Sequence, residues 1–75
     1  MTYDYSKLLG RIKEVCGSQA VFSAFIGLSE RTVSLKLNSK KEWKQSEIEK
    51  SCTVLKIDRN KIPIYFFKTV AQKLE

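Results

Sequence analysis

The 75-residue sequence predicts an all-α domain, for two reasons. Apolar side chains recur at helical spacing along most of the chain, as they do in amphipathic helices. Serines and glycines divide this pattern where helices would begin and end: Ser18 and Ser29 suit N-caps, and Gly17 and Gly27 suit left-handed C-terminal turns. A chain of this length makes one domain at most.

The first expected helix runs from near Tyr5 to Cys16. Asp4 or Ser6 can cap its start, and Gly17 can end it. Arg11 lies off the apolar stripe and could touch a phosphate if this helix crossed a DNA backbone. The stripe consists of Tyr5, Leu8, Leu9, Ile12, Val15 and Cys16.

The pattern at residues 19–38 predicts a helix-turn-helix. A short helix at residues 19–26 is followed by a tight turn at Gly27. Ser29 then opens a second helix, which Asn38 closes. The residues expected to face inward are Ala20, Phe22, Ser23 and Ile26 in the first helix, and Val33 and Leu37 in the second.

Two apolar residues of the first of these helices, Val21 and Phe25, fall on its outer side, four positions apart. Either neighbouring segments half cover them, or they form a small apolar surface for a partner or a second copy.

The second half of the chain continues the helical pattern after a basic loop at residues 39–44. Asp58 can cap one further turn, which Pro63 should end or kink. Residues 62–67 are the densest apolar cluster, and residues 68–75 fit a strand, a helical tail or a frayed end. We therefore divide the chain into a domain at 1–67 and a tail at 68–75. A further amphipathic stretch, from Gln45 or Ser46, points Ile48, Ser51, Cys52, Leu55 and Ile57 inward.

The charge balance favours polyanionic partners. Fourteen Lys and Arg against eight Asp and Glu give a net charge of +6, which suits nucleic acid first and an anionic membrane second. No apolar run approaches the ~20 residues of a membrane span. The chain has no His, CxxC or Gly-rich loop, so we expect no metal, no cofactor, no small-molecule substrate and no enzymatic activity. Cys16 and Cys52 fit reduced core residues of a cytosolic protein.

The outer face of the second helix carries groups that can read base edges. Arg31 can donate two hydrogen bonds to guanine, and Glu30 can accept from cytosine, orient Arg31 or simply favour the helix dipole. Leu35 can meet a thymine methyl, and Ser34 can reach a base edge or a phosphate. Trp43 is better explained as a lid on the core than as a sugar-phosphate contact. Phosphate contacts are expected from Gln19, Thr32, Asn38, Lys40, Lys41 and Lys44.

The stretch QAVFSAFIGLSERTVSLKLNSK resembles the Cro/CI-type helix-turn-helix of phage repressors. The flanking stretches YDYSKLLGRIKE, KQSEIEKSC and IPIYFF resemble small Cro-like repressors of phages of Gram-positive bacteria. The resemblance implies a lambda-repressor-like domain of five helices, phage- or prophage-encoded and located in the cytoplasm of the bacterial host. It also implies a homodimer on a two-fold operator in double-stranded DNA, as part of the lysis-lysogeny switch. By position, it places base reading on Glu30, Arg31, Ser34 and Leu35, and phosphate contacts on Gln19, Thr32, Asn38 and Lys40.

The sequence departs from the family pattern at three places. Ser39 stands where a Gly is common, so it must adopt the turn at some cost. Val21, Ala24 and Phe25 replace polar residues on the exposed side of the first helix of the pair. Lys36 occupies an often apolar slot, where its stem could cover the core while its ammonium reaches solvent.

Two functions follow from these observations. The main prediction is a sequence-specific DNA-binding regulator, a Cro-like repressor. The alternative is a protein-interaction module, like an antirepressor, that binds another repressor through an apolar surface. The candidate residues for that surface are Val21, Phe25, Ile64 and Phe66.

Overall fold

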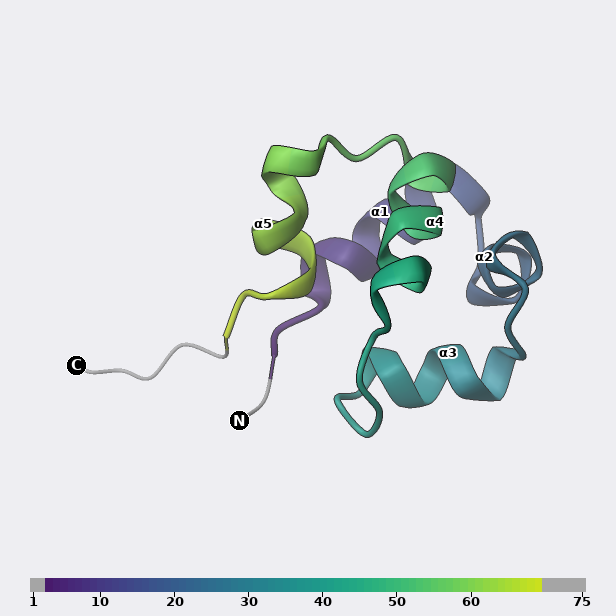
Figure 1. Ribbon diagram of the computed structural model, residues 1–75. Coiled ribbons are helices and arrows are strands. Elements are labelled where there is room, and N and C mark those ends of the chain that lie inside the picture. Colours follow the sequence, from purple (N-terminus) through teal and green to yellow (C-terminus); the bar gives the residue numbers. More distant parts are fainter. Residues whose placement is uncertain (1–2, 70–75) are drawn as a thin grey trace.

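The computed structural model describes residues 3–69 of the chain, and these residues confirm the prediction of an all-α fold with five α-helices (Figure 1). No helix in the described part of the chain is long and apolar enough to cross a membrane. The helices are α1 (Ser6–Cys16), α2 (Gln19–Ile26), α3 (Glu30–Leu37), α4 (Gln45–Leu55) and α5 (Ile62–Phe66), with the 3-10 helix η1 (Arg59–Lys61) directly before α5.

The helix ends lie where the capping residues predict them. The Ser18 hydroxyl accepts the Val21 N–H at 3.2 Å, and the Ser29 hydroxyl accepts the Thr32 N–H at 3.1 Å. Gly17 and Gly27 end α1 and α2 with φ of 86° and 76°, a conformation that costs glycine little.

The N-cap position of α1 is Tyr5, and the Asp4 side chain supports the first turn from one residue earlier. The Asp4 carboxylate accepts the Ser6 N–H at 2.9 Å, so Ser6 is the first helical residue and not the cap. This hydrogen bond is the main reason why the pKa of Asp4 lies below its ordinary value.

The core is built from one apolar face of each helix. Helix α2 packs against α1, α3 and α4, while α1 also packs against α4 and α5. In Figure 1, α3 lies across the lower edge of the molecule, and the two ends of the described chain lie near each other. The buried apolar residues are Tyr5, Leu8, Ile12, Phe22, Ile26, Val33, Leu37, Ile48, Leu55, Ile57 and Phe66.

Three predictions about individual positions are wrong. Ala20 is exposed, because α2 turns Phe22, Ser23 and Ile26 toward the core instead. Pro63 does not end a helix but lies in the first turn of α5, where the missing N–H is not needed. Lys36 does not reach solvent, since only 3% of it is exposed.

Lys36 forms a buried ion pair with Glu47, and this pair joins α3 to α4. The Lys36 Nζ lies 2.9 Å from Glu47 Oε1 and donates to the Glu42 carbonyl at 2.7 Å. Glu47 Oε1 also accepts the Lys44 N–H at 2.9 Å. The ammonium lies 5.9 Å from the centroid of the Trp43 ring, which therefore covers the pair as a lid. The loop between α3 and α4 is thus held by the contacts of Glu42, Trp43 and Lys44 with the ion pair.

The surroundings of Glu47 lower its pKa. Burial alone would raise the pKa, but the Lys44 N–H, the Lys36 ammonium and the charge of Lys44 outweigh burial. Glu47 is therefore ionised in the folded protein over the neutral range.

The residues that follow α5 return to the N-terminal segment. Thr69 and Tyr3 form an isolated antiparallel bridge, and the Asp4 N–H donates to the Lys68 carbonyl at 2.6 Å. The Lys68 ammonium lies 3.8 Å from the Asp4 carboxylate. Residues 68–69 are thus extended, while the remainder of the predicted tail, 70–75, lies outside the described residues.

We expect Lys36→Ala to lower the free energy of unfolding by about 3 kcal/mol, because it leaves the Glu47 carboxylate buried without its partner. Replacing both residues with apolar ones, in Lys36→Met with Glu47→Leu, should restore most of the loss. Urea denaturation at neutral pH measures both variants. A loss below about 1 kcal/mol for Lys36→Ala would show that the pair does not hold the two helices together.

The ion pair also predicts how stability depends on pH. Since the folded pKa of Glu47 is lowered, its contribution is fully present above the unfolded value, about 4.3, and is lost as pH falls through the folded value. The unfolding free energy of the wild type should therefore fall more steeply between about pH 5 and pH 3 than that of Glu47→Gln. Equal slopes in denaturation curves across this range would contradict the assignment.

Candidate functional site

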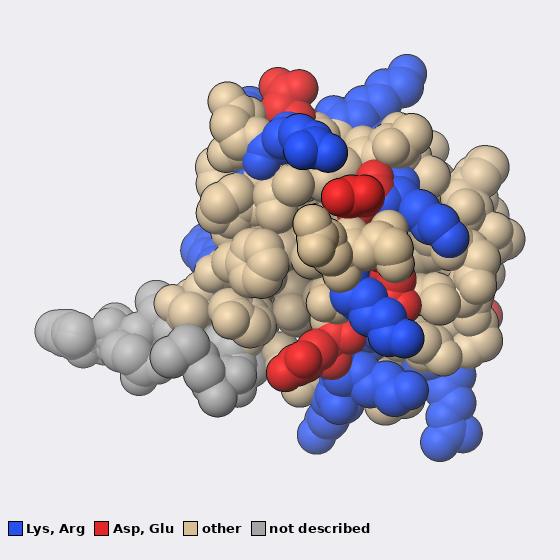
Figure 2. Space-filling view, viewed as in Figure 1, with Lys and Arg blue, Asp and Glu red and all other residues tan. Residues whose placement is uncertain are grey.

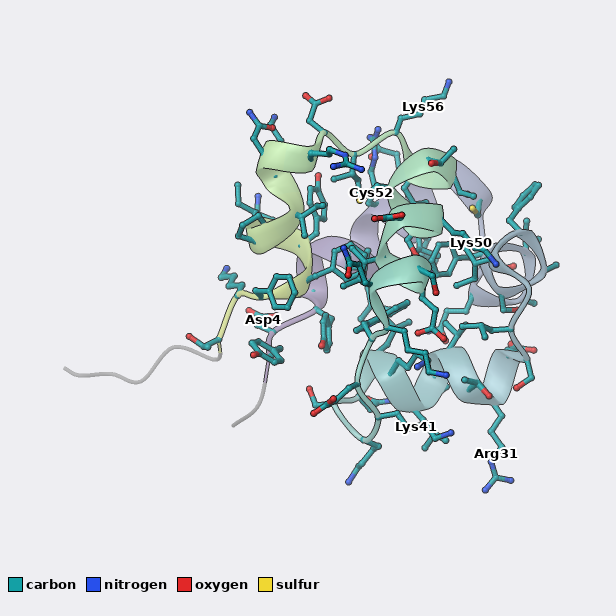
Figure 3. All side chains as sticks on the ribbon, in the orientation of Figure 1. Asp4, Arg31, Lys41, Lys50, Cys52 and Lys56 are labelled. Atoms are coloured by element: carbon teal, nitrogen blue, oxygen red, sulfur yellow. The ribbon has the colours of Figure 1, made fainter. Side chains whose placement is uncertain are left out.

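The outward face of α3 contains the residues that the sequence assigned to base reading. Glu30 and Arg31 are exposed, whereas Ser34 and Leu35 are half-buried. Arg31 extends from α3 away from the rest of the molecule (Figure 3). The side-chain amide of Asn38 donates to the Ser34 carbonyl at 2.8 Å and so closes the helix without a left-handed residue at Asn38 itself.

The left-handed turn comes one residue later, at Ser39, with φ of 62°. This confirms that Ser39 takes the conformation for which the family pattern favours glycine. The Ser39 hydroxyl donates to the Tyr3 carbonyl at 3.3 Å, so the strained turn is tied to the N-terminal segment.

The residues assigned to phosphate contacts are only partly available. Lys40, Lys41 and Lys44 are exposed in the loop after α3. Figure 2 shows Lys and Arg side chains along the lower edge of the molecule, where Figure 1 places α3 and this loop. Gln19 and Thr32 are half-buried, and the Ser29 hydroxyl donates to the Thr32 hydroxyl at 2.8 Å.

The suggested phosphate contact of Arg11 is not supported. Its Nε donates to the Leu55 carbonyl at 2.8 Å, and its guanidinium pairs with Glu14 at 3.0 Å. Arg11 therefore fastens α1 to the end of α4.

The outer face of α2 carries an apolar patch, which we define as Val21 and Phe25. Val21 is 42% exposed and Phe25 is 65% exposed, so neighbouring segments leave much of Phe25 uncovered. Ala20 and Ala24 on the same helix are also exposed, and α2 contains no charged residue. An apolar helix face of this kind in contact with water is a candidate interaction surface.

The apolar residues of α5 divide into two groups. Ile64 is 44% exposed and remains a candidate contact residue, and Phe67, just after the helix, is 49% exposed. Phe66 is only 1% exposed and lies in the core, so its assignment to an interaction surface is wrong.

The described residues give no sign of a metal or redox centre. Within residues 3–69, no group of three or more His, Cys, Asp or Glu side chains could hold a metal ion. Cys16 and Cys52 are half-buried free thiols, and burial raises the pKa of each. Such thiols are poor nucleophiles at neutral pH.

Comparison with known proteins identifies the family. A family model described as "protein of unknown function (DUF739)" matches residues 1–69. The chain belongs to this family. It is also similar to a protein of known structure, the modulator of repression (MOR) of the temperate bacteriophage TP901-1 from Lactococcus lactis. The two are 56% identical, the match covers 95% of this chain and 97% of that one, and the TM-score is 0.79. No curated protein matched.

This similarity overturns the main functional prediction. The similar protein is described as a modulator of repression and not as a DNA-binding repressor, so the prediction of an operator-binding, Cro-like repressor is wrong. The structure offers a physical reason. The helix beside α3 presents Val21 and Phe25 at positions where the Cro/CI-type pattern would have polar residues.

The exposure of the α2 patch predicts that it contributes little to folding. Phe25→Ser should change the free energy of unfolding by less than about 1 kcal/mol, whereas Phe22→Ala, three residues earlier and fully buried, should cost about 3–5 kcal/mol. Thermal or urea denaturation of the two variants makes the comparison. Similar losses for both would mean that Phe25 belongs to the core.

Proposed function

We propose that this protein modulates repression in a temperate phage by binding a repressor protein through the α2 patch. The observation that supports this most strongly is the exposed pair Val21 and Phe25, in a chain 56% identical to a modulator of repression. This is a binding function without a catalytic step, and its partner is a protein.

The α2 patch has the chemistry of a protein contact. Complete burial of a fully exposed Val or Phe is worth about 1.5–3 kcal/mol, and Val21 and Phe25 are 42% and 65% exposed, so a partner that covered both could gain about 2–3 kcal/mol. Binding energy in protein interfaces is commonly concentrated in a few such residues, surrounded by a polar rim. Lys50 of α4, which extends toward α2 in Figure 3, can contribute to that rim.

The helix that carries the patch is already fixed in place. On its inner side, Phe22 and Ile26 are 0% and 2% exposed, and Ser18 and Gly27 fix its two ends. A partner would therefore meet a preorganised surface and lose little entropy in ordering it. We infer that the helix pair resembling the Cro/CI-type helix-turn-helix acts here as a scaffold for protein binding.

Phe25→Glu tests the proposal because it places a charge at the centre of the patch without touching the core. We expect it to weaken binding to the repressor of the phage that carries the gene by at least about tenfold, a loss of about 1.4 kcal/mol. Isothermal titration calorimetry with the purified repressor measures the affinity.

Ile64→Glu tests the competing candidate on α5, where Ile64 is an apolar residue that is 44% exposed. It should leave the affinity unchanged. If Ile64→Glu weakened the complex while Phe25→Glu did not, the contact would lie on α5 and the assignment to α2 would be wrong. If the repressor did not bind the wild-type protein, the proposed function itself would fail.

A further inference from the structure

A hollow separate from the α2 patch lies where the N-terminal segment, the loop after α3 and the end of α5 meet. Its volume is about 530 Å³, within the range of sites that bury a ligand the size of a few side chains. The chain has three Tyr, four Phe and one Trp, and five of these eight aromatic side chains line the hollow. They are Tyr3, Tyr5, Trp43, Phe66 and Phe67.

These five rings form one connected series. Phe67 meets Tyr3 edge-on with centroids 5.9 Å apart, and Tyr3 lies 6.2 Å from Tyr5. Tyr5 lies 6.3 Å from Trp43, which meets Phe66 edge-on at 5.2 Å. Separations of this size are favourable for aromatic pairs, so the rings hold one another in place.

The series has a buried part and an accessible part. Tyr5 and Phe66 are 6% and 1% exposed and belong to the core, whereas Phe67 is 49% exposed and Tyr3 and Trp43 are half-buried. An apolar side chain that entered the hollow would therefore cover the exposed face of Phe67 against walls that are already ordered. The gain from burial would not be offset by the cost of ordering these rings.

One polar group of the aromatic wall is unsatisfied. The Trp43 Nε1–H is buried and has no acceptor within residues 3–69, which costs about 1–3 kcal/mol for a group of this kind. Burial and the neighbouring Tyr3 phenol raise the pKa of the Tyr5 hydroxyl, and the Trp43 indole opposes this rise, yet the two groups do not reach hydrogen-bond geometry.

The charged residues at the rim of the hollow indicate which charge a ligand would carry. Lys40 and Lys41 line it, both are exposed, and neither forms an ion pair with any residue in the described part of the chain. Glu42 also lines the hollow, so two ammonium groups stand against one carboxylate. Together with the net charge of +6, this favours an acidic ligand.

We propose that this hollow is a second protein-binding site, which takes an apolar side chain carried by an acidic chain segment. The aromatic wall covers the side chain, and Lys40 and Lys41 pair with the carboxylates beside it. The site goes beyond the proposed function, because it uses the loop and the end of α5 and shares no residue with the α2 patch.

Trp43 makes the proposal directly testable, since it is the single tryptophan of the chain and lines the hollow. The full-length protein is titrated with a synthetic peptide of four aspartates around a central leucine, and Trp43 fluorescence is followed. We expect a saturable change. A peptide with glycine at the centre, and one with lysines in place of the aspartates, should each bind at least about fivefold more weakly.

Charge reversal separates a specific site from general attraction to a basic protein. Lys40→Glu combined with Lys41→Glu should weaken the leucine peptide at least about fivefold. Lys56→Glu with Lys61→Glu changes the net charge by the same amount. Figure 3 shows Lys56 at the opposite end of the molecule from Lys41. This control should leave the affinity unchanged, as should Phe25→Glu. Circular dichroism verifies that each variant is folded.

Several results would overturn the proposal. Equal affinities for the leucine and glycine peptides would show that the hollow does not take the side chain. Equal losses in the two charge-reversed variants would show only long-range attraction. A response to oligothymidine but not to the leucine peptide would identify a nucleic-acid site, and concentration-dependent dimerisation in sedimentation would identify a second copy as the occupant.

Discussion

The buried ion pair between Lys36 and Glu47 is the interaction on which the arrangement of the helices depends. It lies between the end of α3 and the start of α4, and it is reinforced by the Glu42 carbonyl and the Lys44 N–H. Two charges taken out of water would destabilise the fold if they were less completely paired. The same contacts hold the loop between the helices and place Trp43 over the ammonium. The wall of the aromatic hollow thus depends on a pair of charges outside it.

Helix α2 packs between α1, α3 and α4. Holding α3 in place therefore also determines which side of α2 faces the core and which side faces solvent. Most surface helices have one apolar and one polar face, whereas a helix that is apolar all round is normally covered on every side. Helix α2 is apolar on both sides: Phe22 and Ile26 are buried, and Val21 and Phe25 are exposed. Its inner face is already satisfied by the core. The outer face therefore points to a contact outside this chain.

The sequence predicted the parts of the fold that depend on neighbouring residues. The caps at Ser18 and Ser29 and the turns at Gly17 and Gly27 are local, so they could be identified without the structure. The burial of Lys36 could not be, because its partner Glu47 belongs to the next helix and only the folded loop brings them together. The aromatic hollow cannot be predicted from the sequence for the same reason, since Tyr3, Trp43 and Phe67 come from three distant segments.

The sequence indicates the function less directly than the fold, because one helix pair can serve more than one kind of partner. The sequence pattern of α3 favoured DNA, yet the clearest signal in the chain was a departure from that pattern, the outward Val21 and Phe25. Apolar side chains gain free energy when another protein buries them, whereas a phosphate backbone offers them no favourable contact. The chemistry of the surface, more than the shape of the helix pair, determines which partner can bind.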